Sequence, residues 1–276
     1  MIATIASYRR QIAEHPERYR LVQDARDLRR DARLAVAFDV EGALSIGDRL
    51  DLVDLYYDLG VRWTAFVYNR ANLAGAGCHD DVDEGLTPFG GRLVARMEHA
   101  GMIKCCSHTG YRTALEIFAA ARKPTILSHS NPRALADHER NVPDALLRAC
   151  AQTGGVVGIN AVGLFLGTAD PSARDVFRHL DYVVHLIGPE HVGIAFDSVF
   201  PAAPGASGFE PESRPDYWPP SRGYSRSVTI LGPEILHDVV ACMREAGYSR
   251  SAIDGILGGN FARVAAACWK SGAASA

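Results

Sequence analysis

Five side chains that could carry out chemistry come at the ends of apolar segments: Glu41, Tyr68, His108, His129 and Asp197. In a barrel of parallel strands, the carboxyl ends of the strands meet at one mouth, where active sites are found. A helix surface would scatter the same residues over several faces. The placement therefore predicts that these five side chains lie together in one site.

Glu41, His108 and His129 have the donor types of a divalent metal site. Carboxylate and imidazole ligands suit zinc, which binds nitrogen and oxygen atoms and can keep one position for water. Such an ion would lower the pKa of that water and polarise a carbonyl group. Taken singly, each residue also has a structural interpretation, because a buried histidine can be a hydrogen-bonding partner and Glu41 or Asp197 can stabilise a helix start. The apolar-Ser-His context of both histidines favours the metal site.

The elements that must position these residues alternate along the chain about six times, as parallel βα units do. The predicted strands cover 34–40, 62–68, 102–106, 125–127, 155–159 and 191–196. The predicted helices cover 3–29, 47–59, 88–100, 111–122, 143–153, 172–187, 232–246 and 250–269. This pattern predicts an α/β fold of the (β/α)8 TIM-barrel type. We expect one domain over 1–276, with an N-terminal helical segment at 1–31 and a long Pro/Gly/Ser-rich loop at 200–226.

The composition limits the partners of the chain. Hydrophobic residues make up 47% and charged residues 22%, which predicts a folded core. The net charge is -3 and basic residues are spread out, so we expect no nucleic-acid partner. The charged N-terminus differs from a signal peptide and no apolar run reaches about 18 residues, so we expect no membrane association. Six cysteines without a CxxC pair indicate a reduced, cytoplasmic protein.

Several motifs resemble those of the membrane dipeptidase (renal dipeptidase) family of zinc metallopeptidases, in its bacterial form. They are DVEGALSI (39–46), YNRANLAGAGC (68–78), GLTPFGGRLVARMEHAGM (85–102), SHTG (107–110), SHSNPRALADHERN (128–141), TGGVVGIN (153–160), HVGIAFD (191–197), DYWPP (216–220) and GILGGNFARV (255–264). The resemblance covers nearly the whole chain. It implies a (β/α)-barrel with two zinc ions that hydrolyses dipeptides, often with a D-residue at the C-terminal position.

The resemblance also implies roles for individual residues. Glu41 matches the glutamate that bridges the two metals, and His108 and His129 match the histidines that complete one metal site. Asp197 matches an aspartate near the metals, the expected proton carrier in catalysis. Tyr68 stands where many members have a histidine that supports the tetrahedral intermediate, and a phenol can donate a hydrogen bond there.

Arg140 matches the family's arginine that grips the carboxylate of the substrate. A guanidinium group binds a carboxylate through two parallel hydrogen bonds, so this role is physically sensible. The alternative is an ordinary solvated charge in the polar DHERN run.

Two departures from the family pattern change these expectations. No His-x-Asp motif precedes Glu41, so the chain is expected to start after the first one or two barrel strands and to hold one zinc ion. Exposed strand edges invite pairing, so we expect a homodimer, or coverage of the gap by 1–31 or 200–226. Cys105-Cys106 replaces Asp-Leu of many members, and we interpret both as small buried residues rather than zinc ligands.

The predicted function is a zinc-dependent hydrolase that cleaves a dipeptide, or a similar small amide with a free carboxylate, through a metal-activated water. Two alternatives remain open because a fold alone does not fix a function. One is a metal-dependent lyase, isomerase or other biosynthetic enzyme. The other is a catalytically inactive, dipeptidase-like binding protein.

Overall fold

The computed structural model describes residues 1–28, 32–198 and 210–270. Its strands are β1 (Tyr19–Leu21), β2 (Leu34–Val36), β3 (Phe38–Val40), β4 (Val61–Ala65), β5 (Ile103–Cys105), β6 (Thr125–Ile126), β7 (Val157–Ile159) and β8 (Val192–Ile194). Its α-helices are α1 (Ile2–Glu14), α2 (Leu52–Asp58), α3 (Pro88–Ala100), α4 (Tyr111–Ala120), α5 (Asp144–Gln152), α6 (Gly163–Leu166), α7 (Ala173–Ile187), α8 (Leu236–Glu245), α9 (Arg250–Asp254) and α10 (Asn260–Cys268).

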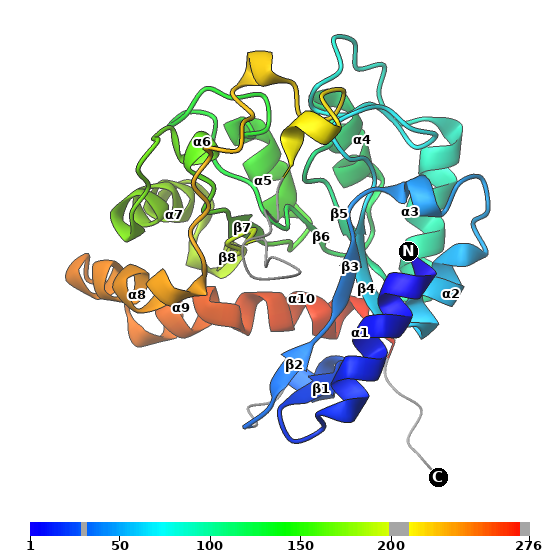
Figure 1. Ribbon diagram of the computed structural model, residues 1–276, viewed down its shortest axis with the longest axis horizontal. Helices are drawn as coiled ribbons and strands as arrows, with labels where there is room; N and C mark the ends of the chain where they lie inside the picture. Colours follow the sequence, from blue (N-terminus) through cyan, green and yellow to red (C-terminus); the bar gives the residue numbers. More distant parts are fainter. Residues whose placement is uncertain (29–31, 199–209, 271–276) are drawn as a thin grey trace.

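The strands are all parallel and follow one another in chain order. They pair as β1-β2, β3-β4-β5-β6 and β7-β8. A parallel bridge between Leu127 and Val157 continues the order from β6 to β7. Figure 1 shows β3 to β8 near the centre, with α3, α4, α5 and α7 around them and α10 running below, whereas β1 and β2 lie lower still, beside α1. Among the described residues β8 and β1 do not pair, so the arc of strands is open between them.

The helix α3 illustrates how local sequence sets the elements. Thr87 caps its start by accepting a hydrogen bond from the Gly90 N–H at 3.0 Å, and Pro88 occupies the first turn. Gly101 ends it with a left-handed backbone (φ +83°), which glycine adopts without strain. Apolar residues on one face, among them Leu93 and Met97, are buried against the strands.

The expected N-terminal helical segment at 1–31 is wrong in its second half. The helix α1 ends at Glu14, since Pro16 disfavours helical conformation in the residue before it and cannot continue the hydrogen-bond ladder. Residues Tyr19–Leu21 then form β1, which pairs with β2. The N-terminal segment therefore extends the arc of strands instead of covering it with a helix.

Two other expectations differ in detail. The strand predicted at 34–40 is divided at Ala37, because β2 pairs with β1 whereas β3 pairs with β4. Of the predicted loop at 200–226, residues 200–209 lie outside the described part, and the remainder contains short 3-10 helices at Pro211–Ser213 and Pro220–Arg222. No helix among the described residues combines the length and apolar character that crossing a membrane requires.

Candidate metal centre and its cleft

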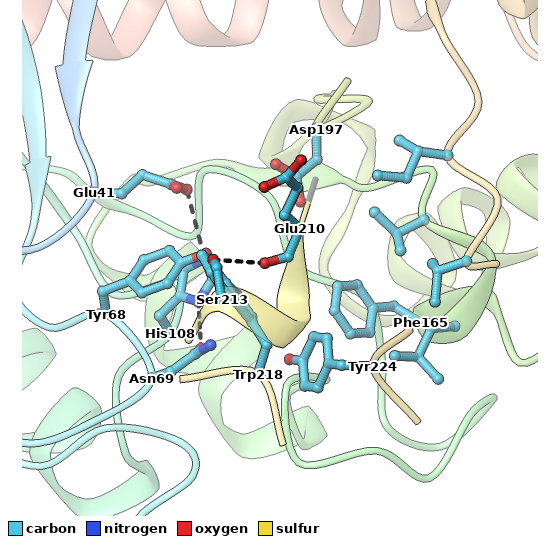
Figure 2. Close-up of a pocket in the computed structure, with 14 residues that line it drawn as sticks. Glu41, Tyr68, Asn69, His108, Phe165, Asp197, Glu210, Ser213, Trp218 and Tyr224 are labelled. Atoms are coloured by element: carbon cyan, nitrogen blue, oxygen red, sulfur yellow. Dashed lines mark hydrogen bonds and ion pairs between the residues drawn. The ribbon is translucent and has the colours of Figure 1, made fainter. Parts of the chain in front are cut away.

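The five predicted site residues converge at the carboxyl ends of the strands. Glu41 directly follows β3, and Tyr68, His108 and Asp197 each come three residues after the end of a strand. These four line one cleft of about 440 Å³ (Figure 2). His129, three residues after β6, contacts both Glu41 and His108. The structure thus brings together the residues that the sequence places at strand ends.

Glu41, His108 and His129 direct three ligand atoms at one point. His129 Nε2 lies 2.9 Å from Glu41 Oε1, His108 Nε2 lies 3.5 Å from the same oxygen, and the two Nε2 atoms are 2.9 Å apart. In the part of the chain that the structure describes, no other group of His, Cys, Asp and Glu side chains meets in this way. One carboxylate and two imidazoles match the protein ligands of a zinc site that keeps its fourth position open.

The backbone is strained at this site. Asn69, His108 and Asp197 have φ values of +56°, +66° and +61°, and no other non-glycine residue of the described ranges has a positive φ. The left-handed region is uncommon outside glycine, although asparagine, aspartate and histidine are enriched there. Residues in such conformations cluster at active sites and ligand clamps, at a cost on the order of 1–3 kcal/mol each. All three strained residues therefore lie beyond the carboxyl ends of the strands, where they line the cleft.

A hydrogen bond to Asn69 fixes the protonation of His108. The Asn69 Nδ2 donates to the Tyr217 carbonyl at 2.9 Å, so its Oδ1 faces His108 Nδ1 at 2.6 Å and must accept from it. His108 Nδ1 therefore carries the proton, and its Nε2 presents a lone pair toward Glu41. Partners of this kind orient histidine ligands in metal sites.

Ser128 plays the corresponding part for His129. Its Oγ lies 2.7 Å from His129 Nδ1, accepts from the Cys105 thiol at 3.0 Å and is positioned to donate to Ser107. With its proton directed at Ser107, this hydroxyl accepts from His129 Nδ1–H, which leaves the Nε2 lone pair free for a cation. Cys105 and its neighbour Cys106 are buried, as expected, and neither belongs to the group of ligand atoms.

The electrostatics of the three donors suit a cation. Burial alone would raise the pKa of Glu41, but the two neighbouring imidazoles, that of His129 above all, outweigh burial and hold that pKa well below its usual range. Burial and the nearby Arg140 lower the pKa of His108, whereas Asp197 and Glu41 overcome burial and raise the pKa of His129. Two imidazole lone pairs and a carboxylate at such distances repel one another unless a proton or a cation lies between them. The residues therefore fit a divalent ion.

Arg140 lies beside the metal centre but does not line the cleft. Its side chain is 2% exposed, and Nη2 donates to the His129 carbonyl at 2.6 Å and lies 3.2 Å from His108 Nε2. Nη1 donates to Ser130 Oγ at 3.3 Å. The guanidinium borders a neighbouring cavity of about 250 Å³ that also reaches His108. Its predicted grip on a substrate carboxylate stays a prediction.

Tyr68 and Asp197 both line the cleft, Tyr68 after the end of β4 and Asp197 after the end of β8 (Figure 2). The Tyr68 ring stacks on His108 with centroids 4.3 Å apart, and its hydroxyl accepts from Trp218 Nε1 at 3.1 Å. Desolvation raises the pKa of Tyr68, so the phenol stays protonated. Asn160 Nδ2 donates to Asp197 Oδ2 at 3.0 Å, and desolvation raises the pKa of Asp197.

The far wall of the cleft is apolar and was not predicted. Its side chains form a small cluster of their own with Tyr224: Val162, Leu164, Phe165, Trp218, Val228 and Ile230. They come from two segments more than 50 residues apart, 162–165 and 218–230. Neither segment has a periodic pattern that would predict this wall, because both are loops or single turns in the structure.

Asp39 is a further acidic residue that sequence reasoning missed. It stands two residues before Glu41 on β3, so both side chains project from the same face. Desolvation and the charge of Glu41 raise its pKa to about 6. The alternating Asp-x-Glu pattern at a strand end was the available signal.

Comparison with known sequences identifies the relatives of this chain. A model of the family "Membrane dipeptidase (Peptidase family M19)" matches residues 1–210. The Dipeptidase aclJ of Aspergillus oryzae is 29% identical over 84% of this chain and 51% of its own length. An uncharacterized protein from the pqqA 5′ region of Klebsiella pneumoniae is 29% identical over 96% of this chain and 95% of its own length. The chain spans about half the length of Dipeptidase aclJ and 42% of an uncharacterized dipeptidase of Schizosaccharomyces pombe.

Solved structures share the fold. An amidohydrolase from Pseudomonas aeruginosa aligns with a TM-score of 0.86 at 24% identity, covering 97% of this chain and 84% of its own. A metallo peptidase from Rhodobacter sphaeroides, liganded with a phosphinate mimic of the dipeptide L-Ala-D-Ala, aligns with a TM-score of 0.78 at 24% identity, covering 96% of this chain and 73% of its own. These matches confirm the predicted fold class.

The matched segment contains Glu41, His108, His129, Arg140 and Asp197, so the site described above lies within it. Family match, fold and site therefore agree. The chain belongs to the membrane dipeptidase family, peptidase family M19.

Proposed function

We propose that this chain is a zinc-dependent hydrolase that cleaves a dipeptide, or a similar small amide with a free carboxylate. The observation that carries the proposal is the convergence of Glu41, His108 and His129 on one point at the edge of a cleft. The hydrogen bonds that His108 and His129 donate to Asn69 and Ser128 support it, because they leave both histidine Nε2 atoms with a lone pair.

When bound, the ion supplies Lewis acidity toward the scissile carbonyl and lowers the pKa of a water. Asp197 would take a proton from the attacking water and pass it to the departing amine. Its raised pKa suits this exchange, and the bond from Asn160 holds one of its oxygens in place. Tyr68 would donate a hydrogen bond from its phenol to the oxygen that becomes negative during attack.

The size and lining of the cleft support a small substrate with an apolar portion. A volume of about 440 Å³ lies within the range of small-molecule sites. Polar groups gather at the end with Glu41 and Asp197, and apolar side chains line the other wall. The metallo peptidase from Rhodobacter sphaeroides is liganded with a phosphinate mimic of L-Ala-D-Ala, a dipeptide with two small apolar side chains.

Three finer expectations belong to the same proposal. Arg140 would bind the substrate carboxylate. Its Nη2 lies beside His108 Nε2 and would have to move away from that atom for the ion to bind there. A homodimer is expected, because the arc of strands is open between β8 and β1 in the described residues. A reducing, cytoplasmic location is expected from six free cysteines.

The test is hydrolysis of a dipeptide panel by the purified chain before and after removal of metal with a chelator. The proposal predicts turnover that is lost with the metal and restored by zinc. The variant Asp197→Asn should keep its zinc and lose about 10³-fold in kcat, since it removes a general base. Turnover that persists in chelated protein, or an unchanged kcat in Asp197→Asn, would contradict the proposed mechanism.

A further inference from the structure

A cluster of aromatic rings lies behind the apolar wall of the cleft. Tyr224 lines the cleft, and its ring meets the rings of His79, His138 and Phe165 edge to face, with centroids 5.5, 5.7 and 6.1 Å away. Tyr224 is 6% exposed and His79 is fully buried. Figure 2 shows Tyr224 beside Phe165, on the opposite side of the cleft from Glu41. The Tyr224 ring therefore has little freedom to move.

The hydrogen bonds within this cluster have fixed donors: Arg222 donates to His79, and His79 donates to Tyr224. Arg222 Nη1 lies 3.1 Å from His79 Nδ1, and a guanidinium can only donate, so His79 Nδ1 accepts. The proton of a neutral His79 is then on Nε2, which donates to the Tyr224 hydroxyl at 2.9 Å. Arg222 is held in turn by Glu139, 3.1 Å away, and by the His79 carbonyl.

The charges around His79 maintain this arrangement. Burial and the neighbouring Arg222 lower the pKa of His79 to about 3, so the ring is neutral at physiological pH. Burial raises the pKa of Tyr224, so its phenol keeps its proton. Since the Tyr224 oxygen accepts from His79, its own proton needs a different acceptor, and residues 1–28, 32–198 and 210–270 supply none. The hydroxyl proton is available to a molecule in the cleft.

We propose that Tyr224 binds substrate by donating a hydrogen bond from its hydroxyl to an oxygen of the substrate carboxylate, and that Arg222 and His79 are positioning residues that orient the hydroxyl. The inference rests on the proposed function. The carboxylate is the acceptor of choice, because Tyr224 lies across the cleft from Glu41, where the non-reacting end of a dipeptide would extend. Arg140, the other expected partner of the carboxylate, has its guanidinium carbon 5.6 Å from the centre of the Phe165 ring, which Tyr224 contacts. The apolar side chains beside Tyr224 would contact the adjoining side chain of the substrate.

The test uses zinc-loaded protein, Tyr224→Phe, and alanyl-leucine with leucine in either configuration. A contact with a non-reacting group contributes equally to substrate and transition state, so its loss raises KM and leaves kcat unchanged. We expect KM to rise about tenfold, the size of one hydrogen bond to a charged group, with kcat within about twofold. The surface variant Tyr8→Phe is the matched control and should leave both constants unchanged. An unchanged KM, or a loss confined to kcat, would overturn the assignment.

A double-mutant cycle tests the positioning role of His79. If His79→Gln acts through the Tyr224 hydroxyl, it raises KM in the wild-type background and has no further effect in Tyr224→Phe. Additive effects in the two backgrounds would overturn this role. Metal content and Tm, measured for every variant, identify any that fails to fold.

Binding measurements separate this inference from the proposed function. If the zinc-loaded wild type turns over no dipeptide, the proposed hydrolase activity fails, and calorimetric binding of alanyl-leucine to wild type and Tyr224→Phe replaces the kinetic comparison. Binding that is about tenfold weaker in Tyr224→Phe supports the contact. Equal affinities, or no binding to the wild type, overturn it.

Discussion

Two pairs of histidines lie close together around the same cleft and differ in how their nitrogen atoms are used. His108 and His129 have ring centroids 5.0 Å apart, and His79 and His138 have centroids 6.1 Å apart. Burial lowers the pKa of His108, and it lowers those of His79 and His138 as well. Proximity and burial alone therefore do not distinguish the pairs.

The lone pairs do distinguish them. His79 accepts from Arg222 and donates to Tyr224, and His138 accepts from the Arg140 backbone N–H at 3.0 Å and donates to the Arg222 carbonyl at 2.9 Å. All four nitrogens of this pair have a hydrogen-bond partner.

In the other pair, both Nδ1 atoms also have partners, but the two Nε2 atoms lie beside each other and beside Glu41, and Arg140 Nη2 lies 3.2 Å from His108 Nε2. The direction of the lone pairs, together with a nearby carboxylate, distinguishes the candidate metal site from the second pair, whose nitrogens are all used in hydrogen bonds.

The largest expected effect comes from removing the carboxylate that only the first pair possesses. Glu41→Gln replaces a charged ligand by a neutral amide, so zinc should be lost and kcat/KM should fall by at least about 10⁴-fold. The measurement is kcat/KM on the best dipeptide of the panel with added zinc. The exposed Glu245→Gln is the matched control and should retain full activity. Substantial turnover by Glu41→Gln would show that the ion is held by other groups.

A smaller effect, on zinc affinity, is expected when the hydrogen bond that orients the His108 imidazole is removed. Asn69→Leu removes the acceptor at His108 Nδ1, and loss of such a partner weakens metal affinity by about 10- to 100-fold. Asn69→Asp keeps an acceptor oxygen and should largely preserve the affinity. Competition with a zinc-binding dye measures both constants. If Asn69→Leu binds zinc as tightly as the wild type, the hydrogen bond does not set the protonation of His108.

The smallest effect concerns the scaffold pair and pH. The pKa of His79 is about 3 in the folded protein and about 6.5 in the unfolded chain, so below pH 6.5 the unfolded state binds more protons. The free energy of unfolding should therefore fall as pH drops, with His79 contributing about 1 kcal/mol per pH unit. Urea unfolding of chelated protein at pH 7.5 and 5.5 measures it.

His79→Gln, which cannot titrate, should lose less stability than the wild type over the same pH interval. Equal losses in the two proteins would mean that His79 becomes protonated in the folded state without cost. That result would remove the basis for the neutral tautomer that donates to Tyr224.

The parts of this fold that depend on local sequence were predictable. The helix predicted at 88–100 has the bounds of α3, and apolar runs placed Glu41, His108 and Asp197 at strand ends. The second half of the N-terminal segment was mispredicted, because Tyr19–Leu21 becomes a strand only through pairing with Leu34–Val36. Such pairing is a tertiary effect that overrides local helix propensity.

The parts of the site that depend on distant partners were not predictable. Asn69 bonds to the Tyr217 carbonyl, 148 residues away, and His79 bonds to Tyr224, 145 residues away. No local pattern announces contacts of this kind. Arg140 is a similar case. Its residue type suggested that it binds a carboxylate, but its hydrogen bonds to His129 and Ser130 became visible only in the folded chain.

We expect Glu41, His108 and His129 to hold a divalent metal, and the neighbouring pair, His79 and His138, to hold none. The most direct measurement is the zinc content of purified wild type, His129→Gln and His138→Gln after dialysis against metal-free buffer, by atomic emission. We expect about one zinc per chain in the wild type and in His138→Gln, and almost none in His129→Gln. Equal zinc content in His129→Gln and the wild type would contradict it.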